Sequence, residues 1–114
     1  MNKLKFATLL LLFSTPALAD HGDLPGPGQP LIIDVRTTSE YQQEHVRQSV
    51  NIPYDEIANR IAAFAPDRDA RIVLYCRSGR RSSVAEQTLR QLGYRQIENL
   101  GGLNDMQRNG YRTN

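Results

Sequence analysis

Short apolar runs alternate with segments of helical periodicity over most of the chain. The runs are rich in β-branched residues and indicate buried strands, whereas apolar residues three or four positions apart indicate helices that pack on them. Strands alternating with helices predict an α/β fold, in which helices flank a central, mostly parallel sheet in three layers. The expected strands are residues 31–35, 50–53, 72–75 and 96–100, and the expected helices are residues 38–45, 56–64, 84–92 and 103–109.

Polar residues mark where three of these helices begin. Thr37-x-x-Glu40 and Ser83-x-x-Glu86 match the capping-box pattern, in which two side chains and two backbone amides satisfy one another. Asp55 is placed to cap the second helix, and Gly93 is placed to end the third. The expected apolar side of the third helix consists of Val84, Thr88, Leu89 and Leu92.

The first 19 residues have the pattern of a secretory signal peptide. Lys3 and Lys5 precede an apolar run, and Ala17-Leu18-Ala19 matches a small-x-small cleavage site. The alternative is a buried N-terminal helix, but no amphipathic period interrupts the run. We expect a periplasmic location after cleavage. The expected division is residues 1–19 as signal peptide, residues 20–30 as a flexible Gly- and Pro-rich leader, and residues 31–114 as one folded domain.

The charge of the chain argues against nucleic acid as a partner. Lys and Arg total 14 against 12 Asp and Glu, a formal net charge of +2. The only lysines, Lys3 and Lys5, lie in the predicted signal peptide, so the remainder has no net charge. Every cation of that remainder is an arginine, whose planar guanidinium suits forked contacts with oxyanions. No later segment is long and apolar enough to anchor the protein stably in a membrane.

The single cysteine, Cys76, follows the most regular predicted strand and precedes a helix. Ligands bind at the carboxyl ends of strands in open α/β sheets, and the amides at a helix start stabilise a thiolate. Arg77, Arg80 and Arg81 add positive charge, and Gly79 permits a tight turn. We therefore predict a reactive thiolate with a lowered pKa. The alternative is an inert buried cysteine beside a solvated basic loop.

An ordered set of short motifs resembles the rhodanese family. The set comprises Ile33-Asp34-Val35-Arg36, Glu40-Tyr41, His45-Val46, Asn51-Ile52-Pro53, Tyr75-Cys76-Arg77-Ser78-Gly79-Arg80-Arg81-Ser82 and Leu100-Gly101-Gly102-Leu103. Each motif alone is weakly specific, but the ordered set is specific and covers most of residues 31–111. The short exported form resembles the periplasmic, phage-shock type of single-domain rhodanese.

The resemblance implies a thiosulfate sulfurtransferase. Cys76 would accept sulfur from thiosulfate as a persulfide and pass it to cyanide or a thiol, and no metal or other cofactor is implied. The substrate-binding residues would be Arg77, Ser78, Gly79, Arg80, Arg81 and Ser82 of the loop that starts at Cys76.

Of three other functions, the sequence disfavours two and leaves the third open as the alternative. A phosphatase of related fold needs Cys-x5-Arg, but the seventh residue counted from Cys76 is Ser82, and the arginine Arg81 is the sixth. A thiol–disulfide oxidoreductase would need a second cysteine to resolve a mixed disulfide. A module that carries or recognises a persulfide with little turnover is the main alternative.

Other motif residues have structural interpretations. Asp34 and Arg36 are expected to form an ion pair near the site, because buried charges need partners. His45 is expected to be a hydrogen-bonded structural residue, since a stabilised thiolate needs no separate base. Tyr41 and Tyr75 are expected to pack with polar tips. The chain departs from the common family pattern, which has Gly at Glu44, Gly-Ala at Gln48-Ser49 and Trp at Met106.

Overall fold

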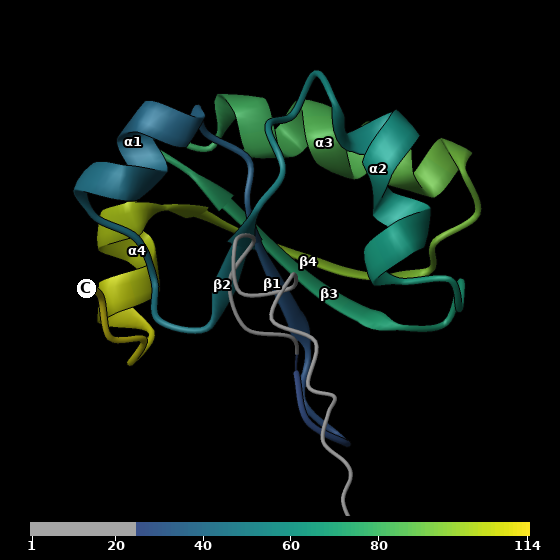
Figure 1. The fold of residues 1–114 in the computed structure, drawn as a ribbon, viewed down its shortest axis with the longest axis horizontal. Helices are drawn as coiled ribbons and strands as arrows, with labels where there is room; N and C mark the ends of the chain where they lie inside the picture. The colour runs from purple at the N-terminus through teal and green to yellow at the C-terminus, as the bar shows by residue number, and fades with distance from the viewer. Residues whose placement is uncertain (1–24) are drawn as a thin grey trace, which may run out of the picture.

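A computed structural model describes residues 25–114, so the predicted signal peptide lies outside the described residues. The strands are β1 (Leu31–Asp34), β2 (Ser49–Asn51), β3 (Arg71–Cys76) and β4 (Gln96–Gly102), and the helices are α1 (Thr38–Gln43), α2 (Ile57–Phe64), α3 (Arg80–Gln91) and α4 (Leu103–Arg108) (Figure 1). The predicted order of elements is confirmed.

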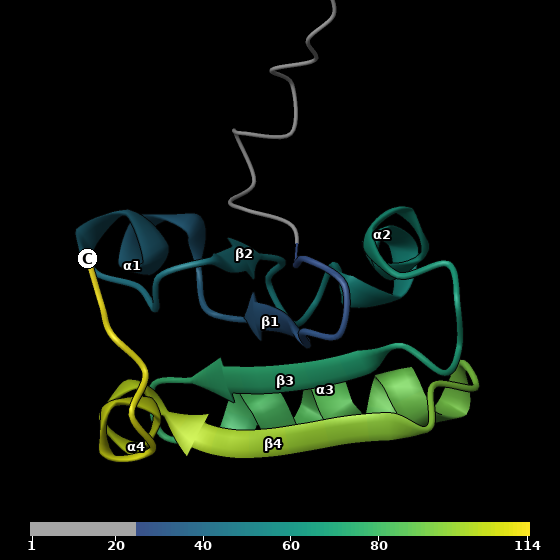
Figure 2. The same ribbon diagram turned by 90° about the horizontal axis from the view of Figure 1, so that it is seen from below.

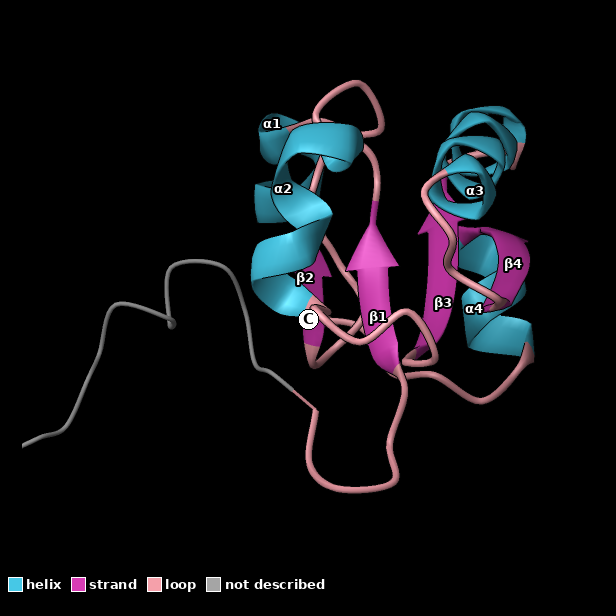
Figure 3. Cartoon of the chain, turned by 90° about the vertical axis from the view of Figure 1, so that its right-hand side faces the viewer, coloured by secondary structure: helices cyan, strands magenta, loops and turns pink. Residues whose placement is uncertain are grey.

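The four strands form one parallel sheet in the order β2-β1-β3-β4. Figure 3 shows β1, β2 and β3 pointing in the same direction. The two central strands, β1 and β3, pair from Leu31 with Ile72 to Asp34 with Tyr75. Because the strands are parallel, their carboxyl ends meet at one edge, where Cys76 terminates β3.

Helices cover both faces of the sheet, which confirms the three-layer arrangement (Figures 1 and 2). Alternate strand residues point to opposite faces. On one face Ile33, Leu74 and Cys76 pack with residues of α2 and α3. On the other face Val73 and Tyr75 pack with residues of α4, in a smaller cluster.

Helix α3 begins three residues earlier than the predicted capping box at Ser83. Its first residue is Arg80, its N-cap is Gly79, and it has no side-chain cap. Only Arg77–Gly79 lie between β3 and α3, so Arg80–Ser82 form part of the first turn of the helix. The buried residues of α3 are Ser82, Ala85 and Leu89. The predicted apolar side is confirmed for Leu89, whereas Thr88 is half-buried. The prediction was wrong for Val84 and Leu92, which are 39% and 37% exposed.

The cap prediction at Asp55 was also wrong, whereas the one at Thr37 is confirmed. Glu56 is the N-cap of α2, and no side chain bonds to that helix start. The Thr37 hydroxyl accepts from the Glu40 amide, and the Glu40 carboxylate accepts from the Thr37 amide. Gly93, with a φ of +98°, follows the end of α3 as predicted.

The departures from the family pattern have distinct structural consequences. Glu44 has an extended backbone (φ −163°), which any residue adopts. Gln48 has a φ of +67°, in the left-handed region that favours glycine. Met106 is fully buried and packs in the cluster with Val73 and Tyr75.

Strand β4 carries a bulge beside the cysteine. Leu74 pairs with Asn99 but Cys76 pairs with Gly102, so β4 has one extra residue there. The bulge places Gly102 against the chain that leaves β3. A β-carbon on Gly102 would lie 2.1 Å from the Arg77 carbonyl oxygen, so only glycine fits.

Candidate active site

Only Arg77–Gly79 connects the end of β3 to the start of α3. Gly79 has a φ of +100°, and this dihedral angle is the reason for glycine. Space is not limiting, because a β-carbon there would lie 3.6 Å from the Gly101 Cα, an ordinary contact. The tight connection turns amides of the first turn of α3 back toward Cys76.

The sulfur of Cys76 lies inside this ring of donors. The Gly79 amide donates to Sγ at 2.9 Å, and the Ser82 amide donates at 3.4 Å. The Ser82 hydroxyl oxygen lies 3.5 Å from Sγ. Cys76 is fully buried, but its sulfur therefore faces polar hydrogens as well as the apolar core.

Two opposing effects act on the pKa of Cys76. Burial raises this pKa, because it disfavours the charged thiolate. Hydrogen bonds from the Ser82 side chain and amide, and from the Gly79 and Ser78 amides, lower it. The hydrogen bonds outweigh burial, so the pKa of Cys76 lies below the ordinary value of a thiol. The arrangement favours the nucleophilic form of cysteine.

The Ser82 hydroxyl belongs to a network that reaches β4. It donates to the Asn99 side-chain oxygen at 2.9 Å or to the Gly79 carbonyl at 3.0 Å. Asn99 also accepts from the Gly101 amide and donates to Ser83. Asn99 was not among the predicted site residues, since 17 positions separate it from Ser82 and no sequence pattern links them.

Two of the three loop arginines are paired with Glu40. Arg81 makes a bidentate contact, from Nη1 to Oε1 at 2.9 Å and from Nη2 to Oε2 at 3.1 Å. Arg77 donates from Nε to Oε2 at 3.2 Å, although its side chain is 71% exposed. Within the described part of the chain, Arg80 is exposed and has no ion-pair partner.

The sequence identified Glu40 only as a capping residue and a motif member. In the structure Glu40 also joins α1 to residues 76–82, here called the cysteine loop, through Arg81, which lies 41 positions further along the chain. The hydrogen bond from Arg81 is the main reason that the pKa of Glu40 is lowered. Burial is the next-largest influence and opposes it, and hydrogen bonds from Thr37 and Arg77 lower the pKa further. Glu40 in turn raises the pKa of Arg81. Both groups are therefore charged under ordinary conditions.

The expected ion pair between Asp34 and Arg36 is present and buried. Arg36 Nη2 lies 2.6 Å from Asp34 Oδ2, which also accepts from the Tyr75 hydroxyl at 2.7 Å. Arg36 Nη2 also donates to the Glu44 carbonyl at 2.6 Å. Burial raises the pKa of Tyr75, so its hydroxyl stays protonated and donates. These contacts fix β1, β3 and the end of α1 relative to one another.

His45 has the contacts of a structural residue. Its Nδ1 lies 2.7 Å from the Tyr41 carbonyl oxygen, and its ring stacks on the Tyr41 ring at 3.8 Å between centroids. The Tyr41 hydroxyl donates a hydrogen bond to the Ser49 carbonyl oxygen, and it is the polar tip that the sequence predicted.

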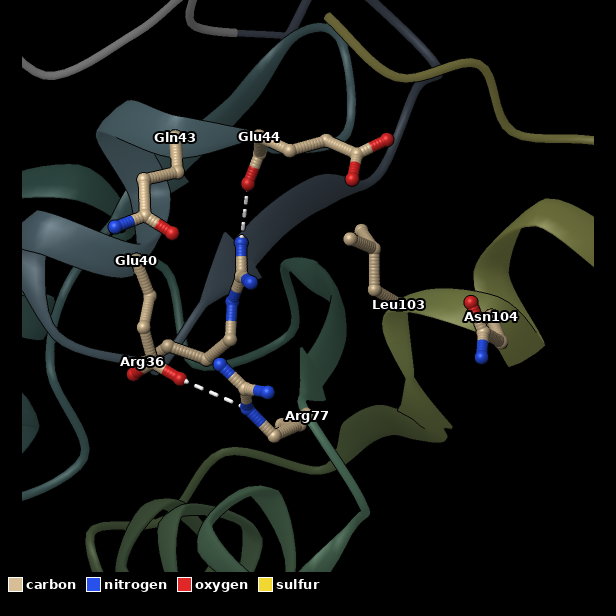
Figure 4. Close-up of a pocket in the computed structure, with 7 residues that line it drawn as sticks. All are labelled: Arg36, Glu40, Gln43, Glu44, Arg77, Leu103 and Asn104. Carbon is tan, nitrogen blue, oxygen red and sulfur yellow. Dashed lines mark hydrogen bonds and ion pairs between the residues drawn. The ribbon is translucent and has the colours of Figure 1, made fainter.

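A pocket of about 330 Å³ lies beside the loop, between α1 and the start of α4 (Figure 4). It is lined by Arg36, Glu40, Gln43, Glu44, Arg77, Leu103 and Asn104. In Figure 4 the Arg77 guanidinium lies at the Glu40 carboxylate and that of Arg36 lies at the Glu44 carbonyl, while Leu103 supplies an apolar wall. The lining combines both signs of charge, so it suits a small polar molecule better than an apolar one.

Residues 25–114 contain no group of three His, Cys, Asp or Glu side chains that could hold a metal ion. Over the same residues, every helix falls short of the length and apolarity that a bilayer crossing requires. The predicted lack of a cofactor stays a prediction.

Comparisons with known proteins agree on one family. The model of the rhodanese-like domain matches residues 18–109. Thiosulfate sulfurtransferase PspE of Escherichia coli is 40% identical over 107 residues, which cover 93% of each protein. A sulfurtransferase of Allochromatium vinosum is 39% identical over 72 residues, which cover 63% of this chain and 65% of that protein.

Solved structures show the same similarity. A structure described as a rhodanese with anions from E. coli superposes with a TM-score of 0.70 at 40% identity, covering 75% of this chain and 98% of the other.

Proposed function

This chain belongs to the rhodanese-like domain family, and from that premise we propose that Cys76 carries sulfur, as a persulfide, from thiosulfate to a nucleophilic acceptor. The chain is a thiosulfate sulfurtransferase, as its similarity to PspE over 93% of both chains indicates. The observation that carries the role of Cys76 is the convergence of the Gly79 and Ser82 amides on its sulfur.

The first half of the reaction loads the enzyme. The Cys76 thiolate attacks the outer sulfur of thiosulfate, a new S–S bond forms, and the bond to the sulfonate sulfur breaks. Sulfite leaves with that electron pair. The persulfide anion then lies where loop amides donate hydrogen bonds, which stabilise it without reorganisation during the reaction.

The second half unloads the enzyme. A nucleophile such as cyanide attacks the terminal sulfur, and the S–S bond breaks with its electron pair returning to Cys76. Thiocyanate leaves and the thiolate is regenerated, a double-displacement sequence. Cyanide is the assay acceptor here, and we propose that a thiol takes its place physiologically.

The loop residues have two proposed roles. The amides around Ser78, Gly79 and Ser82 cradle the transferred sulfur, and the guanidiniums of Arg77, Arg80 and Arg81 hold the oxyanion part of the donor. Of these three arginines, Arg80 is the best candidate to bind the oxyanion, because its guanidinium has no ion-pair partner among residues 25–114. Asp34 and Arg36 act structurally, through the buried pair.

A phosphatase reaction is disfavoured by the size of the loop. Arg81 is the sixth residue from Cys76 and its guanidinium is held by Glu40. A cradle one residue shorter than Cys-x5-Arg encloses a single sulfur atom rather than a tetrahedral phosphate. Hydrolysis of p-nitrophenyl phosphate is a direct check, and none is expected.

We propose that residues 1–19 direct export to the periplasm and are removed there. The pattern of Lys3 and Lys5 followed by an apolar run supports the proposal. Amino-terminal sequencing of protein recovered from the periplasmic fraction tests it.

Replacement of the nucleophile tests the proposed function. Cys76→Ser should reduce thiocyanate formation by at least about a thousandfold, because an alkoxide is not available at neutral pH. A steady-state assay that varies thiosulfate and cyanide provides the measurement, with Gln87→Ala on the exposed face of α3 as the control.

Two results would contradict the proposal. Undiminished turnover in Cys76→Ser would place the nucleophile elsewhere. A wild-type protein that gains the mass of one sulfur from thiosulfate, yet transfers none to cyanide or to thiols, would be a persulfide-carrying module.

A further inference from the structure

Glu40 is the only carboxylate that contacts the cysteine loop among the described residues. Both of its oxygens accept from Arg81, and Oε2 also accepts from Arg77. Its side chain is 17% exposed, and that of Arg81 is 19% exposed. Glu40 therefore meets Arg81 in a partly desolvated setting, where charges act more strongly than in bulk water.

Helix capping does not account for these contacts. The capping box at Thr37 needs a single side-chain acceptor, and Glu40 Oε1 already accepts from the Thr37 amide at 3.0 Å. Glutamine serves equally well at this position of a capping box. The negative charge of Glu40 is thus not required by α1, and it acts on the loop.

The positive charge of the loop has no other compensation on its own helix. The first turn of α3 contains Arg80 and Arg81 and no acidic residue, although the helix start is itself partly positive. Of the other acids near this edge, Asp105 bonds to the Gly102 amide and Arg108, and the Glu44 carboxylate accepts from Thr113. Within residues 25–114, Glu40 is therefore the acid that pairs with the loop arginines and reduces the positive field there.

We propose that Glu40 tunes the anion affinity of the cysteine loop, and that it lowers this affinity for thiosulfate and for unreactive dianions alike. This inference rests on the proposed function. Thiosulfate, sulfite, sulfate and phosphate share oxyanion chemistry, but only thiosulfate has a reactive outer sulfur. A loop with three unopposed arginines would hold all of them tightly. With Glu40 in place, inert oxyanions do not block the site and sulfite is released.

Glu40→Gln is the test variant, since it keeps the shape and the capping acceptor while removing the charge. We expect the KM for thiosulfate and the inhibition constant of sodium sulfate to fall together, by about three- to tenfold. The constants are measured at fixed ionic strength, because salt screens such effects. A merely structural role would instead raise the KM.

Glu86→Gln is the matched control. Glu86 pairs with Arg90 on the same helix, away from the loop, so the same loss of charge there should leave both constants unchanged. Glu40→Asp keeps the charge and should not lower the KM. An unchanged or higher KM in Glu40→Gln, or a sulfate constant that does not fall with it, overturns the proposal.

A second readout is independent of turnover. Sodium sulfate should protect Cys76 from alkylation by iodoacetamide at lower concentrations in Glu40→Gln than in wild type. The sulfate-dependent part of the protection reports on folded protein, because an unfolded chain has no loop for sulfate to occupy. The readout does not depend on whether thiosulfate is the donor. Equal protection in both proteins contradicts the role of Glu40, whereas absent thiosulfate turnover would contradict the proposed function alone.

Discussion

Ser82 is the side chain that distinguishes a stabilised thiolate from an ordinary buried cysteine. Its hydroxyl is the largest of the contributions that lower the pKa of Cys76, and its amide adds another. The hydroxyl has one proton and three oxygen or sulfur neighbours, at Cys76, Gly79 and Asn99. When Cys76 ionises, donation to the sulfur becomes the strongest of these bonds, because it is charge-assisted.

Ser82→Ala should therefore raise the pKa of Cys76 and slow the loading half-reaction near neutral pH. The expected loss at pH 7 is on the order of tenfold, as for removal of one hydrogen bond to a charged group. The rate of iodoacetamide alkylation as a function of pH gives the measurement. Gln87→Ala, on the exposed face of the same helix and outside the Ser82 network, is the control. An alkylation profile identical to that of wild type would contradict the assigned role of Ser82.

Backbone conformation decides whether a residue that replaces a glycine of the family pattern is strained, as at Glu44 and Gln48. Nothing in the sequence distinguishes Glu44 from Gln48, since both replace glycine. The structure separates them, because only Gln48 has a positive φ. A left-handed conformation costs a residue with a side chain roughly 1–2 kcal/mol, whereas an extended one costs nothing.

At the scale of elements, Gln48→Gly should therefore stabilise the turn before β2. Relief of the left-handed strain, less the extra chain entropy of glycine, leaves a gain of about 0.5–1 kcal/mol. For a domain of this size, the gain corresponds to a rise in Tm of a few degrees. Thermal unfolding followed by circular dichroism provides the measurement.

Gln42→Gly supplies the matched control, since it makes the same replacement inside α1. Glycine inside a helix costs about 1 kcal/mol, so this variant should have a lower Tm. A Gln48→Gly protein that melts below wild type would show that the Gln48 side chain contributes contacts that outweigh its strain.

The helices and strands themselves were predictable from the sequence, but the N-caps of α2 and α3 were not. The runs around Ile33 and Leu74 are buried strands because continuous β-prone sequence has few alternatives. The capping box at Ser83 matched its pattern, yet α3 begins at Arg80. The capping-box rule describes the start of a helix in isolation. The start of α3 instead follows the left-handed turn at Gly79, three residues after β3 ends.

The structure of the whole molecule links acid stability to the cysteine loop. Glu40 has a pKa below its ordinary value, with the Arg81 hydrogen bond as the main cause. A carboxyl whose pKa is lower in the folded state adds stability above its unfolded pKa of about 4.3. That stability is lost progressively as pH falls below this value.

Wild-type protein should therefore lose stability between about pH 5 and pH 2, and Glu40→Gln should lose less over the same range. Urea unfolding midpoints across this range give the measurement. Glu86→Gln should follow the wild-type dependence, because its partner Arg90 lies on the same exposed helix face. Parallel curves for wild type and Glu40→Gln would contradict the linkage.

The sequence by itself determined the order of elements, the position of Cys76 at the end of a buried strand, and the place of Arg81 as the sixth residue counted from Cys76. Those properties follow from local pattern and from counting residues. Tertiary structure alone decided that Glu40 neutralises Arg81, that Asn99 holds Ser82, and that Gly102 lies against the Arg77 carbonyl. Each of these contacts joins residues far apart in the chain, and side-chain geometry across a sheet edge leaves no periodic signal in the sequence.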